Sequence, residues 1–202
     1  MIIMLEKMSD EDIDAIREIL NIGIGRSAQM LNRITKSHIT LSIPEVRVCD
    51  VTNLKEGMEK SLDDNSATVK LEFNGIFSGI TAVAFPKDSA AKLVMAMTGE
   101  EAGTPELDSL RIETLKEVGN IMINGVMGSI SNILKAHLEY AVPAYAEESI
   151  ISLLSTNRKA YDEHILMATA CFRIKDMDVE GNIFMVLEIG SLKILIDNIT
   201  KV

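Results

Sequence analysis

Apolar residues recur every three or four positions in two long segments of the chain. In the first segment they are Ile13, Ile16, Leu20, Ile24, Leu31 and Ile34. In the second they are Ile112, Leu115, Met122, Val126, Ile130 and Ile133. An apolar stripe with this spacing predicts an amphipathic helix. We therefore expect two long helices, at about residues 10–36 and 107–138, the first with Ser9 or Asp10 as its N-cap.

Strand-like alternation of apolar and polar residues follows each helix. In the first half it covers residues 39–44, 45–49, 67–73 and 77–85, with a hairpin turn at Asn74-Gly75 and a helix from Pro86 to Met97, with Asp88 or Ser89 near its start. In the second half it covers residues 165–174 and 182–189, with a turn around 176–181 and a helix over 191–199. The polar residues 50–66 are expected to form a loop.

The second half of the sequence repeats the first. When residues 12–21 are placed over residues 111–120, a shift of 99 positions, Glu18 falls on Glu117 and Asn21 falls on Asn120. The same shift places Pro44 on Pro143, although the chain has only 4 prolines. We infer two copies of one unit, at about residues 10–98 and 107–200.

The repeat also predicts the fold class. Residues 99–105, between the copies, are too few for a flexible tether, so we expect one domain over residues 1–202 with pseudo-two-fold symmetry. Each copy contributes a long helix and β-hairpins. The expected class is therefore α+β, with the helices packed on a mostly antiparallel sheet.

Composition and charge exclude several functions. The 202 residues include 30 acidic and 20 basic side chains, and the resulting net charge of −10 disfavours binding to nucleic acid. No uncharged run is long enough to span a membrane, and the apolar start of the chain is too short for a signal sequence. Cys49 and Cys171 share no metal-ligand spacing with the 3 histidines. We expect a cytoplasmic protein without a metal site and without membrane contact.

Polar residues gather on one arc of each helix, away from the apolar stripe. They are Asp14, Glu18, Asn21 and Gly25 in the first helix, and Glu113, Glu117, Asn120 and Asn124 in the second. One such Glu and Asn pair would be an ordinary solvated helix face. Asn is unfavourable within a helix, because its side chain competes for backbone hydrogen bonds, yet it stands beside the same Glu in both copies. We therefore interpret both pairs as functional.

One motif in the first helix resembles a nucleotide-binding sequence but lacks the context that such a site requires. Residues 23–28 fit the glycine pattern of dinucleotide-binding proteins, but that pattern must follow a strand and open a helix. Here it lies inside a continuing helical stripe, so we do not expect nucleotide binding. The glycines are expected to allow close helix packing or close approach of a partner. No phosphate loop and no Ser/His/Asp triad is evident in the sequence.

The two pairs resemble the signature of the CheC/CheX/FliY family, the phosphatases of bacterial and archaeal chemotaxis. That signature is Asp or Ser, three residues, Glu, two residues, Asn, 22 residues and Pro. The first copy matches it with Asp14, Glu18, Asn21 and Pro44, and the second with Glu117, Asn120 and Pro143. The resemblance covers essentially the whole chain, and two copies at this length are typical of CheC-like members. The second copy departs at one position, where Glu113 replaces Asp or Ser.

The resemblance implies hydrolysis of the aspartyl phosphate of CheY, a response-regulator receiver that brings its own Mg²⁺. Asn21 and Asn120 would position the water, and Glu18 and Glu117 would dock the receiver's lysine. The remaining arc residues would form a supporting polar face; they are Asp14, Glu113, Gly25 and Asn124. The resemblance also implies a second partner, the receptor deamidase CheD. No cofactor of its own is expected, and we expect a monomer when the protein is free.

A non-catalytic interaction domain is the alternative. A related domain of the flagellar switch protein FliM binds without hydrolysing, and those relatives lack the Glu and Asn pairs. Such a domain would bind CheD or act as an adaptor at the flagellar switch. The presence of both pairs in this chain favours the phosphatase.

Overall fold

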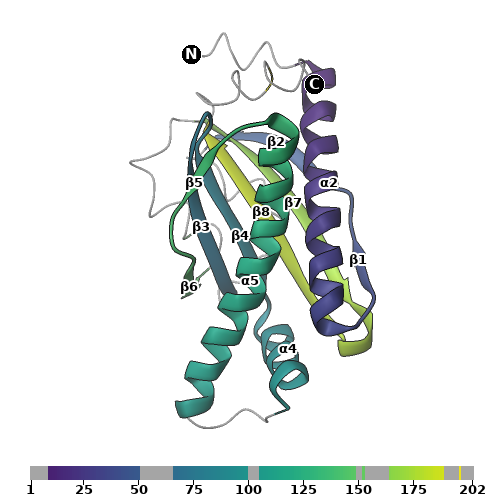
Figure 1. Cartoon of the computed structure of the whole chain (residues 1–202), viewed down its shortest axis with the longest axis vertical. Helices are drawn as coiled ribbons and strands as arrows, with labels where there is room; N and C mark the ends of the chain where they lie inside the picture. The colour runs from purple at the N-terminus through teal and green to yellow at the C-terminus, as the bar shows by residue number, and fades with distance from the viewer. Residues whose placement is uncertain are drawn as a thin grey trace.

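The described residues form one antiparallel sheet with helices packed against it (Figure 1). The computed structural model describes residues 9–50, 66–99, 105–148 and 164–188, together with Ser152 and Ile196. Its helices in these ranges are α2 (Asp10–Thr35), α4 (Lys87–Thr98) and α5 (Pro105–Leu134). Every pair of neighbouring strands in the described part is antiparallel. The predicted α+β class, with helices packed on a mostly antiparallel sheet, is confirmed.

The sheet has eight strands in the described residues. Its order is β1 (Ile39–Leu41), β7 (His164–Ile174), β8 (Val179–Glu188), β4 (Gly79–Phe85), β3 (Ala67–Gly75) and β5 (Leu138–Tyr140). Two further strands continue the outer edges, where β2 (Glu45–Asp50) pairs with β7 and β6 (Ala144–Glu147) pairs with β3. A short 3₁₀ helix, η1 (Lys175–Met177), connects β7 to β8.

Equivalent elements of the two halves lie 99 residues apart. Adding 99 to the bounds of β1 gives those of β5, and β2 and β6 correspond in the same way within a few residues. Lys36 and Lys135, which directly follow α2 and α5, both have a positive φ, at 54° and 50°. The outer strands exchange partners, because β1 and β2 pair with β7 of the second half while β5 and β6 pair with β3 of the first.

The apolar stripes of both helices face the sheet. Leu20 and Leu31 of α2, and Leu115 and Val126 of α5, are almost completely buried in a core shared with the strands. Two stripe positions differ from the prediction, since Ile34 is 40% exposed and Ile112 is 36% exposed. None of the helices in the described ranges is long and apolar enough to cross a membrane.

The first residues of α2 and α4 are capped differently. Ser9 is the N-cap of α2, as expected: its Oγ accepts from the Asp12 N–H at 3.1 Å, and the Asp12 carboxylate accepts from the Ser9 N–H at 3.0 Å. Pro86 is the N-cap of α4 and gives no side-chain cap. Ser89, a residue expected near that start, instead accepts a hydrogen bond from the Glu180 N–H at 3.1 Å.

The first hairpin turn lies where the sequence predicts it, and the second is shorter than expected. The β3–β4 pairing ends at Phe73 and Gly79, so Asn74 and Gly75 lie in the connection, and they also pair with Glu139 and Leu138 of β5. In the second hairpin, η1 completes the turn early, so β8 begins before the expected residue 182. The expected loop, most of the linker and nearly all of the last helix, at 51–65, 100–104 and 191–199, lie outside the described residues.

Candidate functional site

The polar arc of α2 faces solvent. Asp14, Glu18 and Asn21 are exposed, and Gly25 is half-buried. The Asp14 carboxylate accepts a hydrogen bond from the Arg17 guanidinium one turn along the helix. A Cβ added at Gly25 would meet no other atom within 4 Å, so the surface beside Asn21 is open to a partner.

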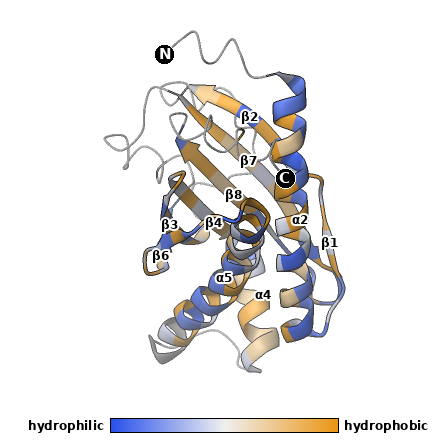
Figure 2. Ribbon diagram, turned by 45° about the horizontal axis from the view of Figure 1, so that its top comes forward, coloured by the Kyte–Doolittle hydropathy of each residue, from blue (hydrophilic) through white to orange (hydrophobic). Residues whose placement is uncertain are grey.

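The polar arc of α5 also faces solvent. Glu113, Glu117 and Asn124 are exposed and Asn120 is half-buried. The Asn124 Nδ2 donates a hydrogen bond to the Asn120 Oδ1 at 2.9 Å, which fixes the orientation of the Asn120 amide. In the first half Gly25 stands at the position equivalent to Asn124, so Asn21 has no such support. The structure therefore places all eight predicted residues at exposed or half-buried positions, while the two pairs remain on separate helices. Figure 2 shows both helices with hydrophilic and hydrophobic positions along the ribbon.

A surface hollow of about 320 Å³ lies beside the α5 pair. It is lined by Glu113, Lys116, Glu117, Asn120, Val142 and Pro143. The last two come from the connection between β5 and β6, which folds back toward the helix. This geometry accounts for the long spacing in the sequence signature, because the proline far from Asn120 in sequence lines the same hollow.

Two residues of this hollow, Lys116 and Val142, were not singled out from the sequence. The repeat could have identified both, because a residue of the same kind stands 99 positions earlier. Arg17 is the equivalent of Lys116, and Ile43 is the equivalent of Val142. Ile43 is 76% exposed and Val142 is 85% exposed. The prolines that follow them differ, since Pro44 is buried and Pro143 is half-buried.

The two helices lie side by side over the sheet (Figure 1), and glycines allow their contact. A Cβ added at Gly23 would lie 3.1 Å from the carbonyl oxygen of Val126, and one at Gly125 would lie 2.7 Å from the Cα of Ser27. The glycine pattern at residues 23–28 therefore lies within the uninterrupted helix α2 and has a packing role at Gly23. This position does not have the strand-to-helix geometry of a dinucleotide site.

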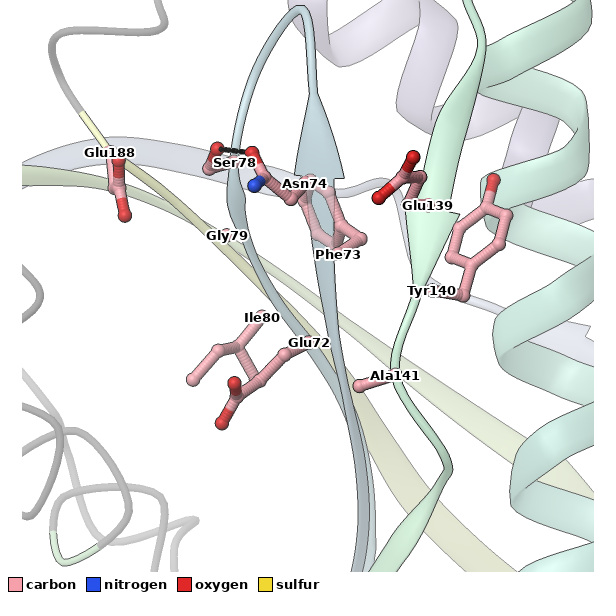
Figure 3. Close-up of a pocket in the computed structure, with 10 residues that line it drawn as sticks. All are labelled: Glu72, Phe73, Asn74, Ser78, Gly79, Ile80, Glu139, Tyr140, Ala141 and Glu188. Carbon is pink, nitrogen blue, oxygen red and sulfur yellow. Dashed lines mark hydrogen bonds between the residues drawn. The ribbon is translucent and has the colours of Figure 1, made fainter.

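A second hollow, of about 410 Å³, lies at the ends of β3, β4 and β5 (Figure 3). Ser78 Oγ donates to Asn74 Oδ1 at 2.7 Å within it, and three carboxylates line it, from Glu72, Glu139 and Glu188. None of the eight functional residues predicted from the sequence lines this hollow. Within the described residues, no group of three or more His, Cys, Asp or Glu side chains is arranged to hold a metal ion.

Comparison with known proteins finds two relatives that are named as phosphatases. The chain is 19% identical over 197 residues to the flagellar motor switch phosphatase FliY of Bacillus subtilis, a match that covers 96% of this chain and 51% of that protein. It is 22% identical over 197 residues to the CheY-P phosphatase CheC of the same organism, covering 92% of both proteins. The resemblance to the CheC/FliY family is confirmed. This chain spans about half the length of FliY, and no family model matches it.

Solved structures of related proteins have the same fold. Thermotoga maritima FliY matches with a TM-score of 0.70 at 20% identity, covering 96% of this chain and 98% of that one. The CheX–CheY–BeF3–Mg²⁺ complex of Borrelia burgdorferi matches with a TM-score of 0.57 at 13% identity, covering 83% and 96%. The FliM–SpeE complex of H. pylori also reaches a TM-score of 0.70, at 9% identity and covering 96% and 97%. The fold is therefore shared by proteins with different names.

Proposed function

We propose that this protein hydrolyses the aspartyl phosphate of a CheY-type receiver. The observation that carries the proposal is the Glu and Asn pair, which recurs on the exposed faces of α2 and α5 at equivalent positions. The similarity to a protein named CheY-P phosphatase supports the reaction class. The complex of CheX with CheY supports the receiver as partner, because this chain shares the CheX fold.

The two side chains divide the task. Hydrolysis requires a water oxygen to attack phosphorus in line with the leaving carboxylate, so that the bond from phosphorus to the receiver's aspartate breaks and a water proton ends on inorganic phosphate. Phosphoryl transfer of this kind depends mainly on positioning and charge compensation. The amide of Asn21 or Asn120 supplies both a donor and an acceptor with which to hold the water. Glu18 or Glu117 pairs with the receiver's lysine and fixes the orientation of docking.

The remaining assignments belong to the same proposal. The receiver supplies Mg²⁺, and this chain contributes no cofactor. Asp14, Gly25, Glu113 and Asn124 support the polar face around the two pairs. CheD is a second partner, the free protein is a monomer, and the reaction takes place in the cytoplasm.

Phosphate release from a ³²P-labelled receiver tests the proposal. Asn21→Ala and Asn120→Ala should each reduce the rate in part, because each pair acts on its own receiver, and the double variant should fall to the receiver's own rate of dephosphorylation. Gln29→Ala and Asn132→Ala are matched controls, since both remove an exposed amide from the same helices outside the two pairs, and both should keep full activity. Full activity in the double variant would refute the assignment.

A non-catalytic interaction domain is the second candidate, and the likeness to the FliM complex favours it. The same assay separates the candidates. A domain that binds CheD or acts as an adaptor at the flagellar switch would leave phosphate release at the receiver's own rate, whereas the phosphatase turns over many receivers for each copy of this chain.

A further inference from the structure

We propose that Ile43 and Val142 are docking residues that contact the receiver through apolar side chains and so determine how tightly it binds. This inference rests on the proposed function and adds to it the residues that recognise the substrate protein. It concerns binding, and it assigns neither residue a role in the chemical step.

Val142 lies in the right place for such a contact. Its side chain is 85% exposed and lines the same hollow as Glu117 and Asn120. Ile43 occupies the equivalent position in the first half and is 76% exposed. Single exposed apolar residues are common on proteins. Here, however, a β-branched apolar residue recurs at the equivalent position of both halves, in one case in contact with the candidate pocket.

The backbone holds both residues in the same way. The Ser42 N–H donates to the Cys171 carbonyl at 2.9 Å, immediately before Ile43. The Ala141 N–H donates to the Glu72 carbonyl at 2.9 Å, immediately before Val142. On the other side of each residue is a proline, which restricts the preceding residue to extended conformations. A residue whose backbone is restrained on both sides loses less backbone entropy when it binds, so it is suited to be an anchor.

The charges beside Val142 favour a receiver as the occupant. The hollow combines an apolar side chain with two carboxylates, from Glu113 and Glu117, and one ammonium group, from Lys116, so its net charge is negative. It therefore suits a protein surface on which a cationic side chain lies next to an apolar one. A second copy of this chain would present the same carboxylates, and the net charge of −10 opposes that association. The complementary partner is therefore the receiver with its active-site lysine.

The test measures KM and kcat for phosphate release with one site at a time. In an Asn21→Ala background, which leaves only the α5 site, Val142→Ala should raise KM about fivefold to fifteenfold, the effect of removing two buried carbons. Val142→Asp should raise KM further, and kcat should stay within about twofold of the background. Met95→Ala and Met95→Asp, at an exposed apolar position on α4, are the controls and should leave both constants unchanged. Ile43→Ala in an Asn120→Ala background should repeat the result at the first site.

The outcomes separate this inference from the proposed function. If Val142→Asp has the same KM as Met95→Asp, or lowers kcat alone, the docking role is wrong although the phosphatase remains. If the unsubstituted protein releases no phosphate, the proposed function is wrong. In that case titration with a beryllofluoride-activated receiver still tests docking. Val142→Asp should raise the Kd for the receiver by at least about tenfold, and an unchanged Kd overturns the inference.

Discussion

Gly119 of α5 packs directly against Val69 of β3, and replacing it with alanine should destabilise the protein. A Cβ built there would lie 2.6 Å from the Cβ of Val69 and 2.8 and 2.9 Å from its two Cγ atoms. Val69 is completely buried in β3. Its Cβ is the nearest atom and does not move when the side chain rotates, so the added methyl group must push the helix and the sheet apart.

The size of the effect follows from two opposing terms. Overpacking a buried site costs about 1–3 kcal/mol. Alanine gains about 1 kcal/mol over glycine within a helix. We therefore expect Gly119→Ala to lower the free energy of unfolding by about 1 kcal/mol. Gly128→Ala is a matched control on the same helix, because a Cβ there meets nothing within 4 Å. It should raise stability by about 0.5–1 kcal/mol.

Urea unfolding followed by circular dichroism measures both variants. The opposite signs on one helix are the critical result, since intrinsic helix propensity alone would stabilise both. Val69→Ala should relieve the overpacking, so the double variant with Gly119→Ala should lose less stability than the two single variants added together. Equal stability of Gly119→Ala and Gly128→Ala, or strict additivity with Val69→Ala, would refute the close contact.

Three further predictions test other parts of the structure. Ser9→Ala removes the capping box of α2 and should lower the free energy of unfolding by about 1 kcal/mol in the same urea assay. Ser9→Asp should keep most of the stabilisation that the N-cap provides. The Ser27 hydroxyl is buried and has no hydrogen-bond partner, so Ser27→Ala should raise stability by up to about 1 kcal/mol, and a loss would show a bond to that hydroxyl. Burial raises the pKa of the Cys49 thiol, so in a Cys171→Ser variant its alkylation rate should reach half-maximum at a higher pH in the folded protein than in urea. The same midpoint in both states would contradict this effect of burial.

The helices could be predicted because each carries a long stripe with a single period. The prediction for α2 was one residue too long, whereas that for α5 extended four residues beyond Leu134. Leu138 lies four residues after Leu134, so the helical spacing continues into β5 although the helix has ended. The positive φ at Lys135 ends it without the glycine or asparagine that usually marks such a position.

The Glu and Asn pairs could be predicted because residues three apart on a helix share a face, which requires no knowledge of the fold. Val142 could not be found in this way, because its place in the hollow depends on how the β5–β6 connection returns to α5. The repeat offered a route to it. Exposed β-branched residues precede the equivalent prolines in both halves, but only the structure shows that they are exposed and that one lies beside the pair.

Exchange of the outer strands makes each site depend on both halves of the chain. Ile43 and the α2 pair belong to the first half, yet the segment that carries Ile43 is held by β7 of the second half, through strand pairing and the Ser42 hydrogen bond. Val142 is held by β3 of the first half in the same manner. In the proposed function, the two sites use separate helices for their polar pairs and one shared sheet to present Ile43 and Val142. Such sites would act independently in the chemical step but share a structural framework, so a substitution that disrupts the β3–β4 or the β7–β8 hairpin should also affect the site of the other half.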